Sequence, residues 1–265
     1  MGEGAPTHGA GRSALWPQQA SWRNGRVLVC SKDGRSMLPY RDINPTRRTP
    51  WLTWLMIMVN VAMYLFEVTL APAAQARLLW ALGFVPARFM GNAPAETFTV
   101  VSSLFVHEGL GHLASNMLFL WVFGDNVEDH LGRRRFVLFY LLTGATALLV
   151  QLMVDPSSAI PVVGASGAIA GVLGAYALLY PRAPVRVVIP PLFFWPFELP
   201  AWVVITYWFL LQVIQGFASL SLPTGQVGVA FFAHIGGFLA GLILVRPLGL
   251  PRPGQGPLSR RVQPW

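Results

Sequence analysis

Four polar side chains that could carry out chemistry lie in otherwise apolar stretches of the sequence. They are His112, Asn116, Ser166 and His234. A serine hydroxyl becomes a nucleophile when a histidine accepts its proton, and imidazole and amide groups can donate hydrogen bonds to the resulting oxyanion. These residue types therefore predict nucleophilic catalysis by a serine, provided that the fold brings them together.

The composition predicts that these residues are surrounded by a membrane. Of the 265 residues, 54% are hydrophobic and only 11% are charged, whereas a soluble domain carries about 25% charged residues. A bilayer-spanning helix needs about 20 apolar residues, and uncharged runs of suitable length recur along the chain. We therefore expect an all-α membrane protein with six spanning helices. Their approximate ranges are 51–69, 108–126, 135–154, 164–180, 200–218 and 229–246.

The distribution of positive charge predicts the topology. Of the 19 lysines and arginines, 17 fall on one side of the six predicted spans, and only Arg77 and Arg88 fall on the other. Cytoplasmic loops are enriched in these residues, so both termini are expected in the cytoplasm. The net charge of +8 thus reflects topology and does not predict nucleic-acid binding. We expect a flexible basic tail over 1–48, a membrane domain over 49–246 and a cytoplasmic tail over 247–265.

This topology places the four polar side chains at a similar depth. Spans two, four and six run in the same direction, and at 1.5 Å per residue the four side chains lie within roughly 12 Å of the outer boundary. Ser166 also lies at a helix N-terminus, where free N–H groups favour a developing negative charge. No carboxylate is expected at this depth. The sequence therefore predicts a dyad, with Ser166 as nucleophile and His234 as general base.

Small residues predict how the helices approach one another. Glycines recur at intervals of three and four residues in span four, and two glycines share a helical face with the histidine of span six. These packing glycines are Gly164, Gly167, Gly171, Gly174, Gly237 and Gly241. The alternative is that the stripe serves packing alone, and that His112 and Asn116 form a polar clasp between helices.

One further pattern invites comparison with a zinc site. His107, Glu108 and His112 differ from the H-E-x-x-H motif because the histidines are five residues apart, about 140° around a continuous helix. The chain has a single cysteine, Cys30, so a cysteine zinc site cannot form either. No metal or cofactor is expected.

Three motifs taken together resemble those of the rhomboid intramembrane serine proteases. They are His112-Leu-Ala-Ser-Asn116, Gly164-Ala-Ser-Gly167 and Ala233-His-Ile-Gly-Gly-Phe-Leu-Ala-Gly241, and the resemblance covers about 50–246. It implies a six-helix rhomboid-like bundle with an oxyanion hole made by Asn116, His112 and the backbone N–H of Ser166. His107 and Glu128 match further family positions and are expected to be structural.

The chain departs from the family pattern in two places. Ala170 stands where many rhomboids have an aromatic residue packed on the catalytic histidine, so that Phe231 or Phe232 could hold His234 instead. Phe98-Thr99 stands where some members have Trp-Arg, in the loop before span two. In addition, the segment 37–45 is similar to the beginning of many bacterial members, which predicts that translation can start at Met37.

The resemblance implies an endopeptidase that cleaves transmembrane segments of single-span or multi-span membrane proteins near the outer face of the lipid bilayer. The composition favours a bacterial inner membrane, and span five is the expected lateral gate for substrates. Two alternatives are a catalytically inactive rhomboid-like protein that binds membrane clients, and a six-span transporter. The presence of both Ser166 and His234 favours the protease.

Overall fold

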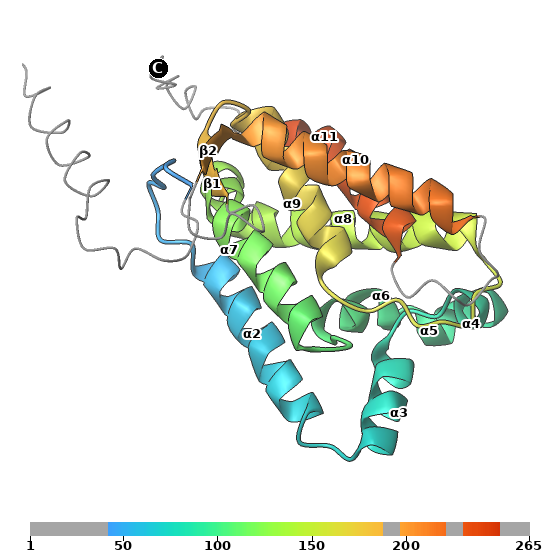
Figure 1. The fold of residues 1–265 in the computed structure, drawn as a ribbon. Coiled ribbons are helices and arrows are strands. Elements are labelled where there is room, and N and C mark those ends of the chain that lie inside the picture. Colours follow the sequence, from blue (N-terminus) through green and yellow to red (C-terminus); the bar gives the residue numbers. More distant parts are fainter. Residues whose placement is uncertain (1–41, 188–196, 221–229, 250–265) are drawn as a thin grey trace, which may run out of the picture. The chain divides into compact units, whose positions relative to one another are not determined.

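The computed structural model describes residues 42–187, 197–220 and 230–249, and most of these residues are helical. Each of the six predicted ranges overlaps one helix of at least 14 residues, and the helix in the range 108–126 continues to Leu131 (Figure 1). In chain order the elements are α2 (Trp51–Glu67), α3 (Pro72–Leu82), α4 (Pro86–Gly91), α5 (Ala93–Glu96), α6 (Thr99–Ser102), η1 (Ser103–Phe105), α7 (Leu110–Leu131), α8 (Arg133–Val154), α9 (Ser166–Leu179), β1 (Pro184–Val187), β2 (Phe197–Pro200), α10 (Ala201–Ser219) and α11 (Phe231–Gly249).

Three of the described helices are long and apolar enough to cross a membrane, judged by length and composition. They are α8, α10 and α11, whereas α2 and α9 are apolar but shorter. Helix α7 has 22 residues, and its last two turns carry Asp125, Glu128 and Asp129. The 14 residues of α9 extend over only about 21 Å at 1.5 Å per residue, less than the ~30 Å of a hydrocarbon core.

Helix α9 lies at the centre of the fold. Every residue from Gly167 to Tyr176 is buried, and the helix contacts α7, α8, α10 and α11. A helix that is covered on all sides must be apolar around its whole circumference. The sequence of α9, which is almost entirely Gly, Ala, Val, Ile and Leu up to Tyr176, meets this requirement.

Glycines allow the close approach of α9 and α11. A Cβ atom on Gly237 would overlap the carbonyl oxygen of Gly167, and one on Gly241 would overlap the carbonyl oxygen of Gly171. Gly174 likewise faces a backbone carbonyl of α11. The two helix backbones are therefore in direct contact, as small residues at an interface permit.

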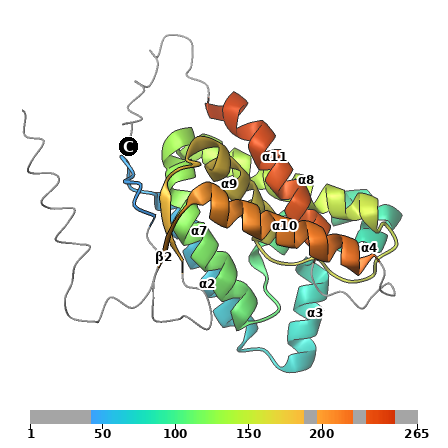
Figure 2. The ribbon, with the colours of Figure 1, turned by 45° about the horizontal axis from the view of Figure 1, so that its top comes forward.

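The short elements gather at the two ends of the long helices. Helices α3 to α6 and η1 connect α2 with α7 at one end, and the antiparallel β1–β2 pair lies at the other (Figures 1 and 2). The pair aligns Pro184 with Pro200 and Arg186 with Glu198. It joins α9 to α10, and both views place α10 beside α11, with which it is in contact.

The segment before α2 packs against the helices. Asp42 is buried, and its carboxylate accepts hydrogen bonds from the Nδ2 atom of Asn126 and the hydroxyl of Tyr176. A buried carboxylate must be hydrogen-bonded, which fixes this segment against α7 and α9. The sequence placed residues 42–48 in a flexible tail, but the structure includes Asp42 in the packed domain. At the other end α11 continues to Gly249, beyond the predicted limit at 246.

Glu128 of α7 caps the N-terminus of α2. Its carboxylate accepts hydrogen bonds from the backbone N–H groups of Leu52 and Thr53, at 3.2 and 2.8 Å, and from the hydroxyl of Thr53 at 2.8 Å. The first N–H groups of a helix have no partner within it. Glu128 supplies that partner and so joins α7 to α2.

Candidate active site

Ser166 is the first residue of α9, and the chain reaches it through a tightly held loop. Phe84 and Val162 exchange two backbone hydrogen bonds, of 3.0 and 2.7 Å, and the N–H of Gly164 donates to the carbonyl of Ser103 at 2.8 Å. Gly164 has a φ of +104°, a conformation that glycine adopts far more readily than other residues. These contacts fix the start of α9 and hence the position of the Ser166 hydroxyl.

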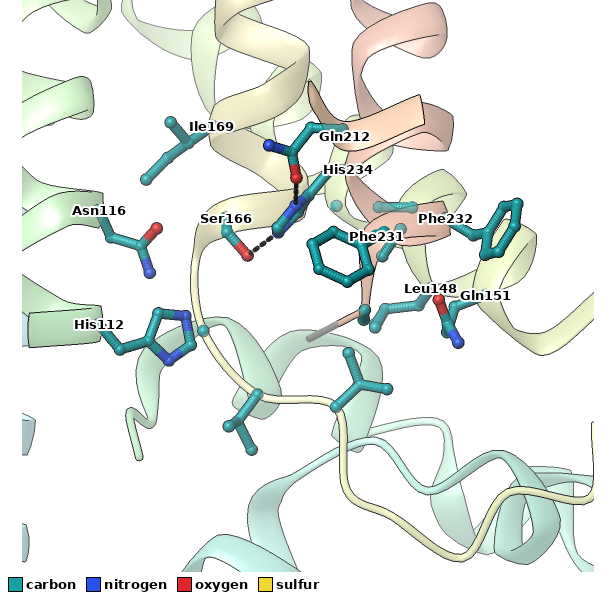
Figure 3. Close-up of a pocket in the computed structure, with 18 of the residues that line it drawn as sticks. His112, Asn116, Leu148, Gln151, Ser166, Ile169, Gln212, Phe231, Phe232 and His234 are labelled. Atoms are coloured by element: carbon teal, nitrogen blue, oxygen red, sulfur yellow. Dashed lines mark hydrogen bonds between the residues drawn. The ribbon is translucent and has the colours of Figure 1, made fainter. Parts of the chain in front are cut away.

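His234 is the hydrogen-bond partner of Ser166. Its Nε2 atom lies 2.8 Å from the Oγ atom of Ser166 (Figure 3). His234 lies in the first turn of α11, just before Gly237, so the backbone contact between α9 and α11 brings the two side chains together. The distance suits transfer of the hydroxyl proton to the ring nitrogen.

A third residue, Gln212 of α10, contacts the other ring nitrogen of His234. The Oε1 atom of Gln212 lies 2.7 Å from Nδ1 of His234 (Figure 3). The indole ring of Trp208, one turn earlier on α10, lies beside the imidazole with ring centroids 6.0 Å apart. Helix α10 therefore contacts His234 both at its Nδ1 atom, through Gln212, and beside its ring, through Trp208.

These contacts answer the question raised by Ala170. Within the described part of the chain, the aromatic ring that packs beside His234 is Trp208. The ring of Phe232 instead meets Phe217 of α10, at a centroid distance of 6.2 Å. Phe232 therefore does not replace the aromatic residue missing at Ala170, and the interpretation that Phe231 does so stays a prediction. The ring of Trp208, on α10, lies beside His234.

His112 and Asn116 point from α7 toward the space beside Ser166 (Figure 3). Gly164 faces both of them: a Cβ atom there would lie 2.6 Å from the ring of His112 and 3.3 Å from Nδ2 of Asn116. The sequence assigned Gly164 to the packing stripe of a helix, but the structure places it before α9. Its missing side chain leaves room for two hydrogen-bond donors next to Ser166.

His107 contacts Asn116 directly, and Glu67 contacts His107. The ring of His107 is buried, and its Nε2 atom lies 3.0 Å from Nδ2 of Asn116. Burial, together with the neighbouring His112, lowers the pKa of His107 to about 4, so its ring is neutral at pH 7 and can accept the amide hydrogen. The backbone N–H of His107 in turn donates to the buried carboxylate of Glu67 at 3.3 Å. Asn116 is thus oriented by a chain of buried contacts.

The relation between His107 and His112 corrects an expectation. Helix α7 begins at Leu110, so His107 is not on the helix that carries His112. Their rings meet edge to face with centroids 5.2 Å apart, and the expected separation of about 140° on one helix is wrong. No three His, Cys, Asp or Glu side chains in the described ranges are grouped as a metal site requires.

The site opens into a cavity of about 710 Å³. Ser166, His234, His112 and Asn116 line it together with apolar groups such as Leu148 (Figure 3). Ligand-binding cavities usually measure about 300–1,000 Å³ and combine an apolar lining with a few polar groups. This cavity therefore has the size and the lining of a ligand-binding site.

Arg88 holds the loop that leads toward α7. Its guanidinium pairs with Glu96 at 2.7 Å, donates to the carbonyl oxygens of Trp80 and Gly83, and lies over the Trp80 ring at 4.4 Å from the centroid. Phe98, which stands where some family members have tryptophan, is exposed. Arg88 and its partners therefore stabilise the segment that precedes Phe98-Thr99.

Gln212, Trp208 and Glu67 are the site residues that the sequence analysis missed. Gln212 lies seven residues before the end of α10 at Ser219, and His234 lies three residues after the start of α11. The depth comparison made for spans two, four and six would have found Gln212 if span five had been included. Glu67 ends the uncharged run of α2, but nothing in its sequence neighbourhood indicates its contact with His107.

Comparison with known proteins identifies the family. Residues 94–250 match the Rhomboid domain. The chain belongs to the rhomboid family. The matched range contains Ser166, His234, His112 and Asn116, and with the apolar helices α8, α10 and α11 it indicates a multi-pass membrane protein.

Three rhomboid relatives illustrate the similarity. Rhomboid protein 1, mitochondrial, of Saccharomyces cerevisiae is 33% identical over 149 residues, which cover 55% of this chain and 40% of that protein. Rhomboid protease GluP of Bacillus subtilis is 30% identical over 205 residues, 77% of this chain and 36% of GluP. Rhomboid-like protein 11, chloroplastic, of Arabidopsis thaliana is 29% identical over 209 residues, 76% and 66% of the two chains. The chain matches less than two thirds of the length of each of these relatives.

Proposed function

We propose that this chain is an intramembrane serine endopeptidase that cleaves transmembrane segments of membrane-protein substrates. Ser166 is the nucleophile and His234 the general base. The observation that carries the proposal is the 2.8 Å contact between Oγ of Ser166 and Nε2 of His234 at a cavity that His112 and Asn116 also line. The similarity to GluP, a protein named as a rhomboid protease, supports the same activity.

The mechanism follows from this geometry. His234 accepts the hydroxyl proton as Oγ of Ser166 attacks the scissile carbonyl carbon. The oxyanion then accepts hydrogen bonds from Asn116, His112 and the backbone N–H of Ser166, which lies in the first turn of α9, where N–H groups lack partners within the helix. His234 passes its proton to the leaving amine, and a water molecule deprotonated by His234 hydrolyses the acyl-enzyme.

The proposed topology has six spans, α2, α7, α8, α9, α10 and α11, with both termini in the cytoplasm. The positions of 17 of the 19 lysines and arginines support it. The proposed membrane domain extends from the buried Asp42 to the end of α11 at Gly249, somewhat beyond the limits 49–246 expected from the sequence, between a basic N-terminal tail and a C-terminal tail. A bacterial inner membrane is the proposed location, on the strength of composition alone.

The length of α9 supports a site below the outer membrane surface. At about 21 Å, this helix is shorter than the hydrocarbon core, so its start at Ser166 lies inside the membrane if its other end reaches the cytoplasmic surface. Irregular backbone at that depth is tolerated only where protein buries it or where it lines a water-filled cavity. The loop before Ser166 satisfies both conditions, since Val163 and Gly164 are buried and line the cavity.

A helical substrate must unwind before Ser166 can reach a carbonyl carbon. Glycine, proline or polar residues near the outer end of the substrate helix therefore favour cleavage, and a small residue is expected before the scissile bond. Replacement of such a helix-breaking residue by leucine should slow cleavage of a single-span reporter. Equal rates for the two reporters would contradict this part of the proposal.

Cleavage of a single-span reporter in membranes tests the proposed activity. Wild type should cut the reporter, whereas Ser166→Ala and His234→Ala should not. Cutting by all three proteins would mean that another nucleophile or another protease is responsible. If none cuts, the absence of fluorophosphonate labelling at Ser166 would identify a client-binding rhomboid-like protein, whereas labelling would show that the reporter was the wrong substrate.

A further inference from the structure

We propose that Gln212 is a positioning residue that fixes the tautomer and ring orientation of His234, an inference that rests on the proposed function of Ser166 and His234. To act as general base, His234 must present an unprotonated Nε2 to the Ser166 hydroxyl, and its proton must therefore be on Nδ1. Gln212 faces Nδ1 with an oxygen, which can only accept a hydrogen bond. The contact thus selects the tautomer that the mechanism requires.

The orientation of the Gln212 amide is determined by its second contact. Its Nε2 group donates to the carbonyl oxygen of Trp208 at 3.4 Å, while Oε1 faces Nδ1 of His234 at 2.7 Å. Rotating the amide by 180° would place its oxygen against the Trp208 carbonyl oxygen and would leave two acceptors facing each other. It would also direct an N–H group at Nδ1 and stabilise the tautomer that cannot accept the serine proton.

Burial strengthens this preference. Gln212 is 8% exposed, and a buried amide without hydrogen-bond partners costs free energy, so its side chain is held in the orientation that satisfies both ends. His234 likewise has one partner at each ring nitrogen, Ser166 at Nε2 and Gln212 at Nδ1. The three side chains form a chain of hydrogen bonds from α10 through α11 to α9.

The choice of an amide suits the surroundings of the site. A carboxylate at Nδ1 would stabilise the imidazolium more strongly, but a charge inside a membrane domain is costly. A glutamine oxygen orients the ring without that cost. Gln212 therefore provides the orientation that the third residue of a serine-protease triad gives, without its charge.

Three substitutions separate this role from simple packing. Gln212→Met keeps the length of the side chain but removes the acceptor, whereas Gln212→Glu keeps an acceptor oxygen whether or not the carboxyl group is protonated. Gln75→Met on α3, outside the site, is the matched control. For each protein in detergent or liposomes, kcat and KM for a single-span reporter, the rate of fluorophosphonate labelling at Ser166 and the thermal unfolding midpoint would be measured.

We expect Gln212→Met to lower both kcat and the labelling rate by about tenfold or more, which corresponds to loss of one hydrogen bond, with KM changed less than about twofold. Gln212→Glu should recover most of the labelling rate, and Gln75→Met should behave as wild type. Wild-type kcat and labelling in Gln212→Met would overturn the inference alone. Equal losses of kcat and of labelling rate in the Gln212→Met and Gln212→Glu variants, with unfolding midpoints that match wild type, would also overturn it. A wild-type protein that neither cuts nor labels would instead overturn the proposed function, and this inference with it.

Discussion

Helices α11 and α10 both hold His234, but they are attached to the rest of the domain in different ways. Helix α11 carries the histidine, and its Gly237 and Gly241 lie directly on the backbone of α9. Helix α10 carries Gln212, and its outward side exposes large side chains, with Tyr207, Ile214 and Phe217 each more than 60% exposed. The nucleophile and base are thus placed by backbone contact, whereas the group that orients the base comes from the more loosely covered helix.

This difference separates two requirements of the site. The separation of the Ser166 and His234 backbones depends on how closely α9 and α11 pack. Rotation of the side chains does not change this separation. The orientation of the imidazole depends on where α10 lies, because Gln212 and Trp208 both belong to it. Displacement of α10 would therefore leave α9 and α11 packed together but would remove the hydrogen bond that orients the His234 ring.

Outside the dyad itself, the largest effect is expected at Asn116, which α7 holds beside Ser166. Asn116→Ala removes an oxyanion donor that His107 orients, and should lower kcat by roughly 100- to 1,000-fold. The folded protein should keep its unfolding midpoint within a few degrees. Steady-state cleavage of the reporter measures the rate, and an effect below about threefold would exclude Asn116 from the oxyanion hole.

The next effect tests the backbone contact between α9 and α11. Gly241→Ala should destabilise the protein by about 2–3 kcal/mol, because its Cβ meets the carbonyl of Gly171 and the helices must separate. Gly91→Ala is the matched control, since a Cβ atom there has nothing within 4 Å. Thermal unfolding in detergent compares them, and equal midpoints would show that α9 and α11 can separate without cost.

A smaller effect should appear at Glu128, which caps α2 and takes no part in the dyad. Glu128→Ala removes the cap of α2 and leaves the N–H groups of Leu52 and Thr53 without that partner, at a cost of about 1–3 kcal/mol. The kcat of the folded fraction should not change. A fall in kcat with unchanged stability would mean that Glu128 acts on the site, contrary to its place in the structure.

The smallest effect is expected on the exposed side of α10. Ile214→Ala removes a side chain that is 63% exposed, so stability should change by no more than about 0.5 kcal/mol and kcat by less than about twofold. Unfolding midpoints and reporter kinetics would be measured together. A large loss of stability would show that this face is covered by protein and would weaken the contrast between α10 and α11.

The sequence predicted the parts of the site that depend on the position of residues along helices. Six helices follow from the uncharged runs, and the four residues that counting along those helices grouped together, Ser166, His234, His112 and Asn116, line one cavity. The rotation of one helix against another does not follow from such counting. For this reason the contact of Gln212 with Nδ1 of His234 was not predicted.

Loop conformation was the second feature that the sequence did not predict. Gly164 continues the glycine spacing of α9, yet its positive φ places it outside the helix and beside His112. His107 was treated as part of the helix that carries His112, although α7 begins only at Leu110. Asp42 looked like part of a polar tail, and its contacts with Asn126 and Tyr176 join residues more than 80 positions apart. Spacing rules assume a regular element, and each of these residues lies where an element has not yet begun.

The most direct test of the central claim is the site of covalent labelling. Purified wild-type protein would be treated with a fluorophosphonate, and the modified residue identified by mass spectrometry, with His234→Ala treated in parallel. The Ser166–His234 contact predicts an adduct on Ser166 in wild type and at least a hundredfold slower labelling in the variant. An adduct on a different serine, or equal labelling of the two proteins, would contradict the proposed dyad.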